Sequence, residues 1–138
     1  MTREEKFINF FSHLTANNLD EIYNVFSSKA HFKDPFNDVN GVKEINNVFN
    51  HMFATTEQPK FIVNHSAAKQ EKLFIQWQFT FIKNKTNWSI DGSSMVTFDE
   101  NDKVIEHIDY WDPAEQIYSK IGLLRPIMNF LKSRLTAS

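Results

Sequence analysis

Apolar residues in the first part of the chain recur at intervals typical of helices. Residues 2–5, Thr-Arg-Glu-Glu, have the spacing of a capping box, and the apolar positions of residues 7–14 follow at helical intervals. A second short apolar stripe occupies residues 19–26, which predicts a helical hairpin at the start of the chain. A third helix is expected to begin at Gly41 and to continue to about residue 53. Before it, Pro35 disfavours helical backbone at Asp34, so residues 30–34 are expected to be extended.

Beyond residue 60 the apolar pattern changes to a period of two. Residues 61–67, 73–82, 88–98 and 104–111 are rich in β-branched and aromatic side chains, and short polar links separate them. Four sequential strands with short links predict an antiparallel meander. A final helix is expected to begin at residues 112–115, Asp-Pro-Ala-Glu, with interruptions at Gly122 and Pro126.

Helices followed by strands predict an α+β fold in a single domain spanning residues 1–138. We expect a cone-shaped, curved antiparallel sheet wrapped around three N-terminal helices, with a C-terminal helix, because a twisted sheet with helices on one side curls around them. The concave side of such a sheet can leave a cavity.

Alternation along two of the strands bears on what faces that cavity. Residues 73, 75, 77, 79 and 81 form a wholly apolar face, which needs burial either in the core or against a second subunit. In residues 104–111 both faces mix polar and apolar side chains, so alternation does not choose the interior face there.

Composition narrows the classes of partner. Fifteen Lys and Arg against seventeen Asp and Glu give a net charge of −2, so no basic field is available for nucleic acid. There is no cysteine, which excludes disulfides and thiolate chemistry. With no long apolar run and no secretory signal at the start, we expect no membrane span and a cytoplasmic protein.

Cofactor and metal motifs are also missing from the sequence. The chain has three glycines, too few for a phosphate-cradling or dinucleotide-binding loop, and its histidines lack the short spacing of a metal-binding pair. We therefore expect no cofactor and no metal.

Three short segments, together with the order of elements, resemble a known superfamily. They are Ala30-His31-Phe32-Lys33-Asp34-Pro35, Lys103-Val104-Ile105 and Asp109-Tyr110-Trp111-Asp112. The likeness is to the nuclear transport factor 2-like superfamily, above all to its SnoaL-like and ketosteroid isomerase-like branches, and it extends from the first helix to the last strand. The resemblance implies a ligand pocket inside the cone and dimers formed through the outer face of the sheet.

In the ketosteroid isomerase branch, the catalytic base matches Asp34 of this chain. The two donors of that branch's oxyanion hole fall at Phe10, which has no hydroxyl, and near Ser94. The resemblance therefore carries over the base but not the complete set of donors.

In the limonene epoxide hydrolase branch, a catalytic acid near the end of the last strand matches Asp109. The arginine and the second aspartate of that branch fall near Gln78 and Thr80, and its tyrosine and asparagine fall near Phe32 and Asp34. The SnoaL-like cyclases, which use an acid in a polar and aromatic pocket to move a proton on a carbon acid, are the least demanding match.

These correspondences imply a pocket in which Asp34 and Asp109 are the catalytic groups. The ligand-binding residues implied with them are Phe10, Phe32, Gln78, Thr80, Ser94, His107 and Trp111. The outer aromatic stripe that would form a homodimer is Trp77, Phe79, Phe81 and Tyr110.

The sequence therefore leads to two hypotheses from different classes. In the first, the protein binds a small hydrophobic or ring-containing molecule and performs cofactor-free acid/base catalysis of the isomerase, cyclase, hydratase or epoxide hydrolase type. In the second, it is a non-catalytic ligand-binding or protein-interaction module of the same fold.

Each candidate residue also has a purely structural interpretation. Asp34 is well placed to hold a turn around Pro35, and Asp109 to pair with His107, Arg125 or a helix end. His107 has the alternative of a hydrogen-bonded, partly buried imidazole, and Asp112 is expected to be a helix N-cap.

Overall fold

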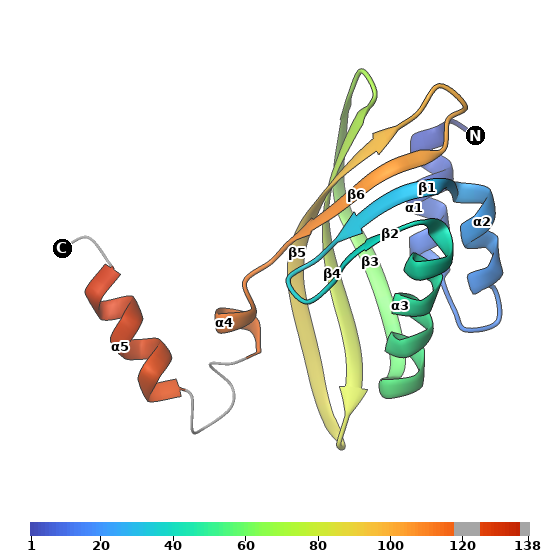
Figure 1. The fold of residues 1–138 in the computed structure, drawn as a ribbon. Coiled ribbons are helices and arrows are strands. Elements are labelled where there is room, and N and C mark those ends of the chain that lie inside the picture. The colour runs from blue at the N-terminus through green and yellow to red at the C-terminus, as the bar shows by residue number, and fades with distance from the viewer. Residues whose placement is uncertain (118–124, 136–138) are drawn as a thin grey trace.

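Six strands form one curved sheet with the N-terminal helices packed against one side of it (Figure 1). The computed structural model describes residues 1–117 and 125–135. The described helices are α1 (Arg3–Ser12), α2 (Ile22–Val25), α3 (Val42–Thr55), α4 (Pro113–Gln116) and α5 (Arg125–Leu135), with one 3₁₀ turn at Leu19–Glu21. The strands are β1 (Phe26–Lys33), β2 (Asp38–Asn40), β3 (Glu57–Lys69), β4 (Lys72–Lys83), β5 (Thr86–Phe98) and β6 (Val104–Tyr110).

The sheet confirms the predicted meander and adds one parallel pair. Strands β3 to β6 pair antiparallel in sequence order, as predicted. The full strand order is β2-β1-β6-β5-β4-β3, and β1 pairs parallel with β6. The parallel pair arises because α3 carries the chain from β2 to the far edge of the sheet, from which four strands return to β1. The α+β cone fold is therefore correct, but the sheet is mixed rather than wholly antiparallel.

The helix starts follow their predicted capping residues. The Thr2 hydroxyl accepts a hydrogen bond from the Glu5 amide while the Glu5 side chain accepts one from the Thr2 amide, which completes the capping box of α1. The Asp112 side chain accepts from the Ala114 amide at the start of α4. The predicted second helix is shorter than its apolar stripe, because Phe26 already begins β1.

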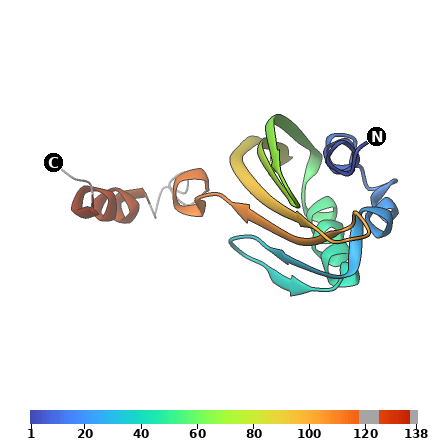
Figure 2. The same cartoon turned by 90° about the horizontal axis from the view of Figure 1, so that it is seen from above.

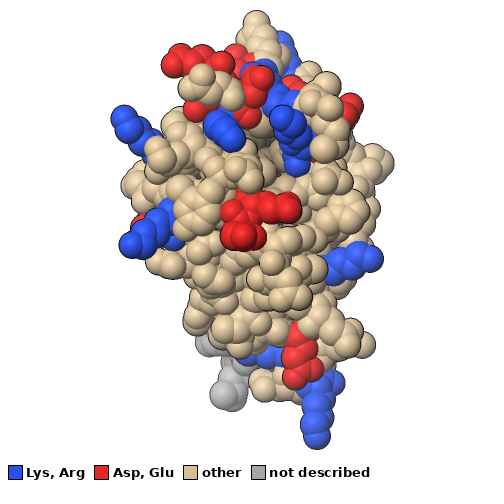
Figure 3. Space-filling model, turned by 90° about the vertical axis from the view of Figure 1, so that its right-hand side faces the viewer, with Lys and Arg blue, Asp and Glu red and all other residues tan. Residues whose placement is uncertain are grey.

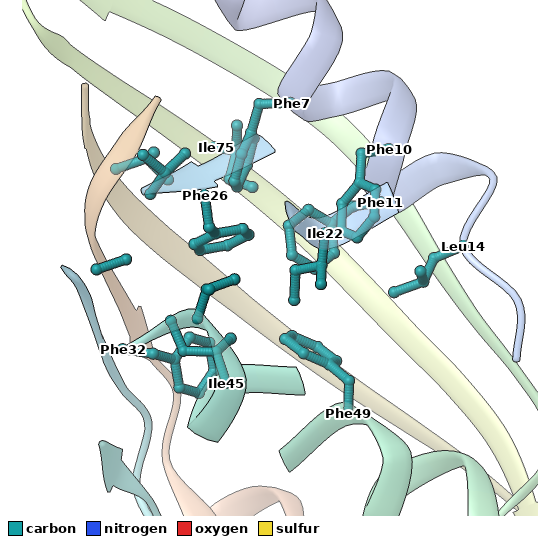
Figure 4. Close-up of a cluster of buried hydrophobic side chains, with 14 of the residues drawn as sticks. Phe7, Phe10, Phe11, Leu14, Ile22, Phe26, Phe32, Ile45, Phe49 and Ile75 are labelled. Atoms are coloured by element: carbon teal, nitrogen blue, oxygen red, sulfur yellow. The ribbon is translucent and has the colours of Figure 1, made fainter. Parts of the chain in front are cut away.

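Phenylalanine rings fill the space between the helices and the sheet. Figure 4 shows Phe7 of α1 above Phe26 of β1, with Phe10 and Phe11 of α1 to the right of Phe26 and Phe49 of α3 below. Each buried ring of this size contributes roughly 1.5–3 kcal/mol to stability relative to an exposed one. Figure 2 shows the sheet curving toward the side on which the N-terminal helices lie.

The predicted C-terminal helix lies partly outside the described residues. Residues 118–124, which include the expected interruption at Gly122, are not described. Pro126 lies in the first turn of α5. Among the helices of residues 1–117 and 125–135, none is long and apolar enough to cross a membrane.

Candidate functional site

Strand β6 presents its two chemically informative residues on the side of the sheet that faces the helices. His107 lies opposite Val96 of β5 and Phe32 of β1, and Asp109 lies opposite Ser94 of β5. Because Val96 and Phe32 are buried in the core, the face that carries His107 and Asp109 is the inner one. The pairing register with the neighbouring strands thus identifies the inner face of β6, which alternation within the strand did not.

Strand β4 has the opposite orientation to the one implied by the family resemblance. Trp77 is 6% exposed and belongs to the core, and Phe79 packs against that core. The rings of Phe81 and Trp88 stack with centroids 6.1 Å apart on the same face. The predicted outer stripe is therefore wrong for Trp77, Phe79 and Phe81, because this apolar face gains more free energy by covering the helices than by facing solvent.

Alternation of side chains along β4 also places Gln78 and Thr80 outside the predicted pocket. Both side chains lie on the outer face of the sheet, where the Gln78 amide donates to the Ser89 hydroxyl at 2.9 Å. Their assignment to the pocket was wrong, since a one-residue shift in a strand moves a side chain to the other face. Tyr110, which is 57% exposed, does lie on the outer face as predicted.

A cavity of about 180 Å³ lies between α3 and the inner face of the sheet. It brings together four of the predicted site residues: Phe32, Asp34, Asp109 and Trp111. A much smaller cavity of about 20 Å³ is also lined by Asp109, together with Ser94 and His107. Phe10 is 5% exposed in the core and lines neither cavity, so it is not a pocket residue.

Several of the side chains that form the cavity walls were not among the predicted site residues. Apart from the four predicted residues, the walls consist of Asn37, Val48, Phe49, His51, Met52, Phe61, Trp77, Phe79 and Ile90. The helical periodicity of α3 and the apolar face of β4 already contained the signal for most of them.

A chain of hydrogen bonds fixes the Asp109 carboxylate at the cavity wall. The Trp77 indole Nε1 donates to the Ser94 hydroxyl at 2.8 Å, and that hydroxyl donates in turn to Asp109 Oδ1. The His107 imidazole Nε2 lies 2.7 Å from the same Oδ1 atom. Asp109 Oδ2 has no hydrogen-bond partner among the described residues. One carboxylate oxygen is therefore held by Ser94 and His107.

Phenylalanine rings surround the imidazole of His107, which is 3% exposed. Its ring stacks with Phe26 at a centroid distance of 5.9 Å, and Phe7, Phe11 and Phe32 lie at 5.0–5.6 Å. Its Nδ1 atom is buried and has no hydrogen-bond partner in the described part of the chain. Because Nε2 faces a carboxylate oxygen, it carries a hydrogen and donates to Asp109.

Asp34 holds the turn that follows β1. Its Oδ1 atom accepts from the amides of Phe36 at 2.8 Å and Asn37 at 2.7 Å, and the Asn37 side chain donates to both carboxylate oxygens. Burial raises the pKa of Asp34, and the negative charge of Asp109 adds to this rise, while the hydrogen bonds of the turn oppose it. Asp34 is thus both the predicted turn residue and a cavity residue with a perturbed pKa.

Among residues 1–117 and 125–135, no group of three or more His, Asp or Glu side chains could hold one metal ion. On the face of the molecule turned toward the viewer in Figure 3, basic and acidic side chains are intermixed near one end and scattered elsewhere.

Comparisons with solved structures support the observed fold. A protein with a ketosteroid isomerase-like fold from Catenulispora acidiphila, solved in complex with trimethylamine, has a TM-score of 0.73 and 12% identity, and the match covers 88% of this chain and 95% of that one. A protein assigned as a SnoaL-like polyketide cyclase from Shewanella putrefaciens has a TM-score of 0.72 and 15% identity, with 89% and 98% covered. An LEH-like epoxide hydrolase of M. tuberculosis has a TM-score of 0.68 and 14% identity, with 99% of this chain and 92% of that one covered.

Comparison at the level of sequence gives the family. No curated protein matches the chain. The family model of the SnoaL-like domain matches residues 7–107, from the first helix to the strand that carries His107. With this match over most of its length, and with the fold of nuclear transport factor 2-like and ketosteroid isomerase-like structures, the chain belongs to the SnoaL-like domain family.

Proposed function

We propose that this protein binds a small, ring-containing hydrophobic molecule in the cavity between α3 and the sheet and transfers a proton on it without a cofactor. The observation that carries the proposal is the Asp109 carboxylate, whose Oδ1 is occupied by Ser94 and His107 while Oδ2 takes no hydrogen bond from the described residues. A general base needs this combination of a fixed position and a free lone pair.

The size and the walls of the cavity favour a compact ring. Its volume of about 180 Å³ is close to the roughly 150 Å³ in which a benzene molecule binds in an engineered apolar cavity. The walls carry the aromatic side chains of Phe49, Phe61, Phe79 and Trp111, which suit a planar or alicyclic ligand.

Asp34 is the second proton-transfer group in this proposal. Its raised pKa favours the protonated form relative to an ordinary aspartate, so Asp34 can donate its own proton to the substrate after Asp109 has removed another, and exchange of both groups with solvent restores the starting state. Two carboxyl groups with different surroundings in one cavity are a common arrangement for paired acid and base roles. Isomerisation, cyclisation and hydration all need this pair of steps.

Deuterium exchange on a simple carbon acid tests the proposal. The protein is incubated with 2-cyclohexen-1-one in D₂O, and loss of the proton α to the carbonyl is followed by NMR. We expect the protein to accelerate exchange, and Asp109→Asn to remove most of a general-base contribution of about 10²–10⁴-fold. Glu106→Gln, which changes a carboxylate on the outer face of the same strand, is the matched control and is expected to retain exchange.

A specific observation favours a second candidate, a binding module without catalysis. The Asp34 carboxylate accepts from two backbone amides and from the Asn37 side chain, so the turn alone accounts for its presence. If ring compounds bind but exchange stays at the buffer rate for native protein and Asp109→Asn alike, the catalytic proposal is wrong and the binding module is favoured.

We also infer a homodimer formed through the outer face of the sheet. Phe74 of β4 and Tyr110 of β6 are 46% and 57% exposed there, and both line a shallow depression with Met95 of β5. Exposed apolar area on a sheet face supports association with a second copy. The predicted dimer is thus retained with a different set of contact residues.

A further inference from the structure

Two acidic side chains line the cavity, and its described walls hold no Lys or Arg. The acids are Asp34 and Asp109, and Lys33 lies outside this cavity, in an adjoining surface depression that both acids also line. The charge of Asp109 contributes to the raised pKa of Asp34, so the two carboxyl groups interact. His51 of α3 is the other ionisable side chain of the wall, and it lies on the exposed side of the cavity.

His107 and Ser94 are the described residues that hydrogen-bond to Asp109. The Nε2 atom of His107 lies 2.7 Å from Asp109 Oδ1, and its Nδ1 atom is buried among phenylalanine rings without a partner among the described residues. Ser94 donates to the same oxygen as a neutral group.

The walls next to these carboxylates are aromatic rings. Phe61 and Phe79 stack with centroids 4.5 Å apart, and the ring of Trp77 lies 6.4 Å from Phe61. Trp111 completes the aromatic wall near Asp34 and Asp109. The faces of such rings carry negative charge density and attract organic cations, most strongly at tryptophan and away from water.

We propose that the preferred ligand of this cavity is an organic cation, a protonated amine or a quaternary ammonium group joined to a small ring. This inference rests on the proposed function, since it names the class of molecule that the same cavity accepts. An anion of that size would meet two acidic side chains, and a neutral ring would gain burial and at most a hydrogen bond to Asp109. A cation gains the same burial together with the aromatic walls and the charge of the Asp109 carboxylate.

Three ligands of nearly the same shape compare a cationic, a neutral and an anionic ring compound. Benzylamine, benzyl alcohol and benzoate are titrated into the native protein at pH 8, where an ordinary imidazole is neutral and benzylamine is a cation. Binding is followed by calorimetry and by the indole N–H resonance of Trp77. We expect benzylamine to bind at least about tenfold more tightly than benzyl alcohol, and benzoate to show no saturable binding.

Variants then identify the group responsible for the preference. Asp109→Asn is expected to lower the ratio of benzylamine to benzyl alcohol affinity, and Glu106→Gln, on the outer face of β6, is expected to leave that ratio unchanged. Equal affinities for benzylamine and benzyl alcohol in the native protein would overturn the cation inference and leave the proposed function intact. If none of the three compounds shifts the Trp77 signal or gives heat, both proposals fail.

Discussion

The indole ring of Trp77 lies over Gly92, in the space that a β-carbon on residue 92 would occupy. An ideal β-carbon there would be 2.5 Å from Cζ2 and 2.6 Å from Cη2 of the ring. The two residues face each other across β4 and β5, so the absence of a side chain on Gly92 lets the ring lie close to the sheet. This close approach places the indole N–H on Ser94 and thereby fixes Asp109.

We predict that Gly92→Ala destabilises the protein by about 1–3 kcal/mol, the usual range for overpacking a core. On an unobstructed strand, alanine would instead stabilise by about 0.5–1 kcal/mol relative to glycine. The contact with Trp77 makes the expected change in stability unfavourable, because that ring is packed and cannot move aside freely. Urea unfolding monitored by tryptophan fluorescence measures the change. Ser93→Ala, on the outer face, is the control, and a Gly92→Ala variant as stable as this control would contradict the packing argument.

Asp34→Asn is expected to change how stability depends on pH. Burial raises the folded-state pKa of Asp34 above the unfolded value of about 3.9, so the folded state binds more protons between these two values. The free energy of unfolding of the native protein therefore falls as pH rises through this window. Asparagine keeps an oxygen to accept the turn's hydrogen bonds but cannot ionise.

Unfolding of both proteins from pH 4 to pH 7 measures the effect. We expect the stability of Asp34→Asn relative to the native protein to increase with pH, and a constant difference would show that Asp34 is not desolvated. Asp99→Asn, the same change in a surface turn, is the matched control.

His31 is expected to give a pH dependence at higher pH. Its pKa is raised, chiefly by the hydrogen bond of Nε2 to Asp38 at 2.6 Å and also by Glu106, which lies 3.3 Å from Nδ1. The stabilisation that follows from this raised pKa is fully present below the ordinary histidine pKa of about 6.5. It is lost as pH rises through the folded-state pKa of His31.

His31→Gln removes this contribution, which we expect to be below about 1 kcal/mol because the partners are exposed. Native protein should therefore lose stability relative to His31→Gln between pH 6 and pH 8 in thermal unfolding. His65→Gln, on the outer face of β3, is the control, and parallel curves for the native protein and His31→Gln would refute the assignment.

Phe74→Glu is expected to convert the proposed dimer to monomers. Phe74 is 46% exposed on the outer face of β4, and a carboxylate placed there would be buried without a partner in a two-fold interface. Sedimentation velocity gives the mass. Lys43→Glu, on the exposed side of α3, should leave the mass unchanged. A dimer that persists in Phe74→Glu would mean that this face is not the interface.

Much of the fold could be predicted from local signals in the sequence. The capping box at Thr2 and Glu5 and the N-cap at Asp112 act over a few residues, so spacing alone identified them. The four strands of the meander followed from their period of two. The parallel pairing of β1 with β6 could not be predicted in the same way, because it depends on the path of the whole chain between them.

The candidate site was predicted less completely, for reasons that particular residues make clear. Periodicity put Trp77 and Phe79 on one apolar face that required burial, and that inference agrees with the structure. The error came from short family correspondences, which assigned Gln78 and Thr80 to the interior. This assignment exchanged the inner and outer faces of β4. For Asp109 and His107, alternation was ambiguous, and the cross-strand register with Ser94 and Val96 supplied the missing information.

The three tryptophans provide the most direct test of the central claim that the cavity between α3 and the sheet binds a small ring compound. Trp77 and Trp111 line this cavity, whereas Trp88 does not. Indole N–H signals, assigned with single Trp→Phe variants, are recorded by ¹H–¹⁵N NMR while benzylamine and benzyl alcohol are added. We predict saturable shifts of the Trp77 and Trp111 signals with at least one of these compounds, and an unchanged Trp88 signal. Signals that do not move with either compound, or a shift confined to Trp88, would contradict the claim.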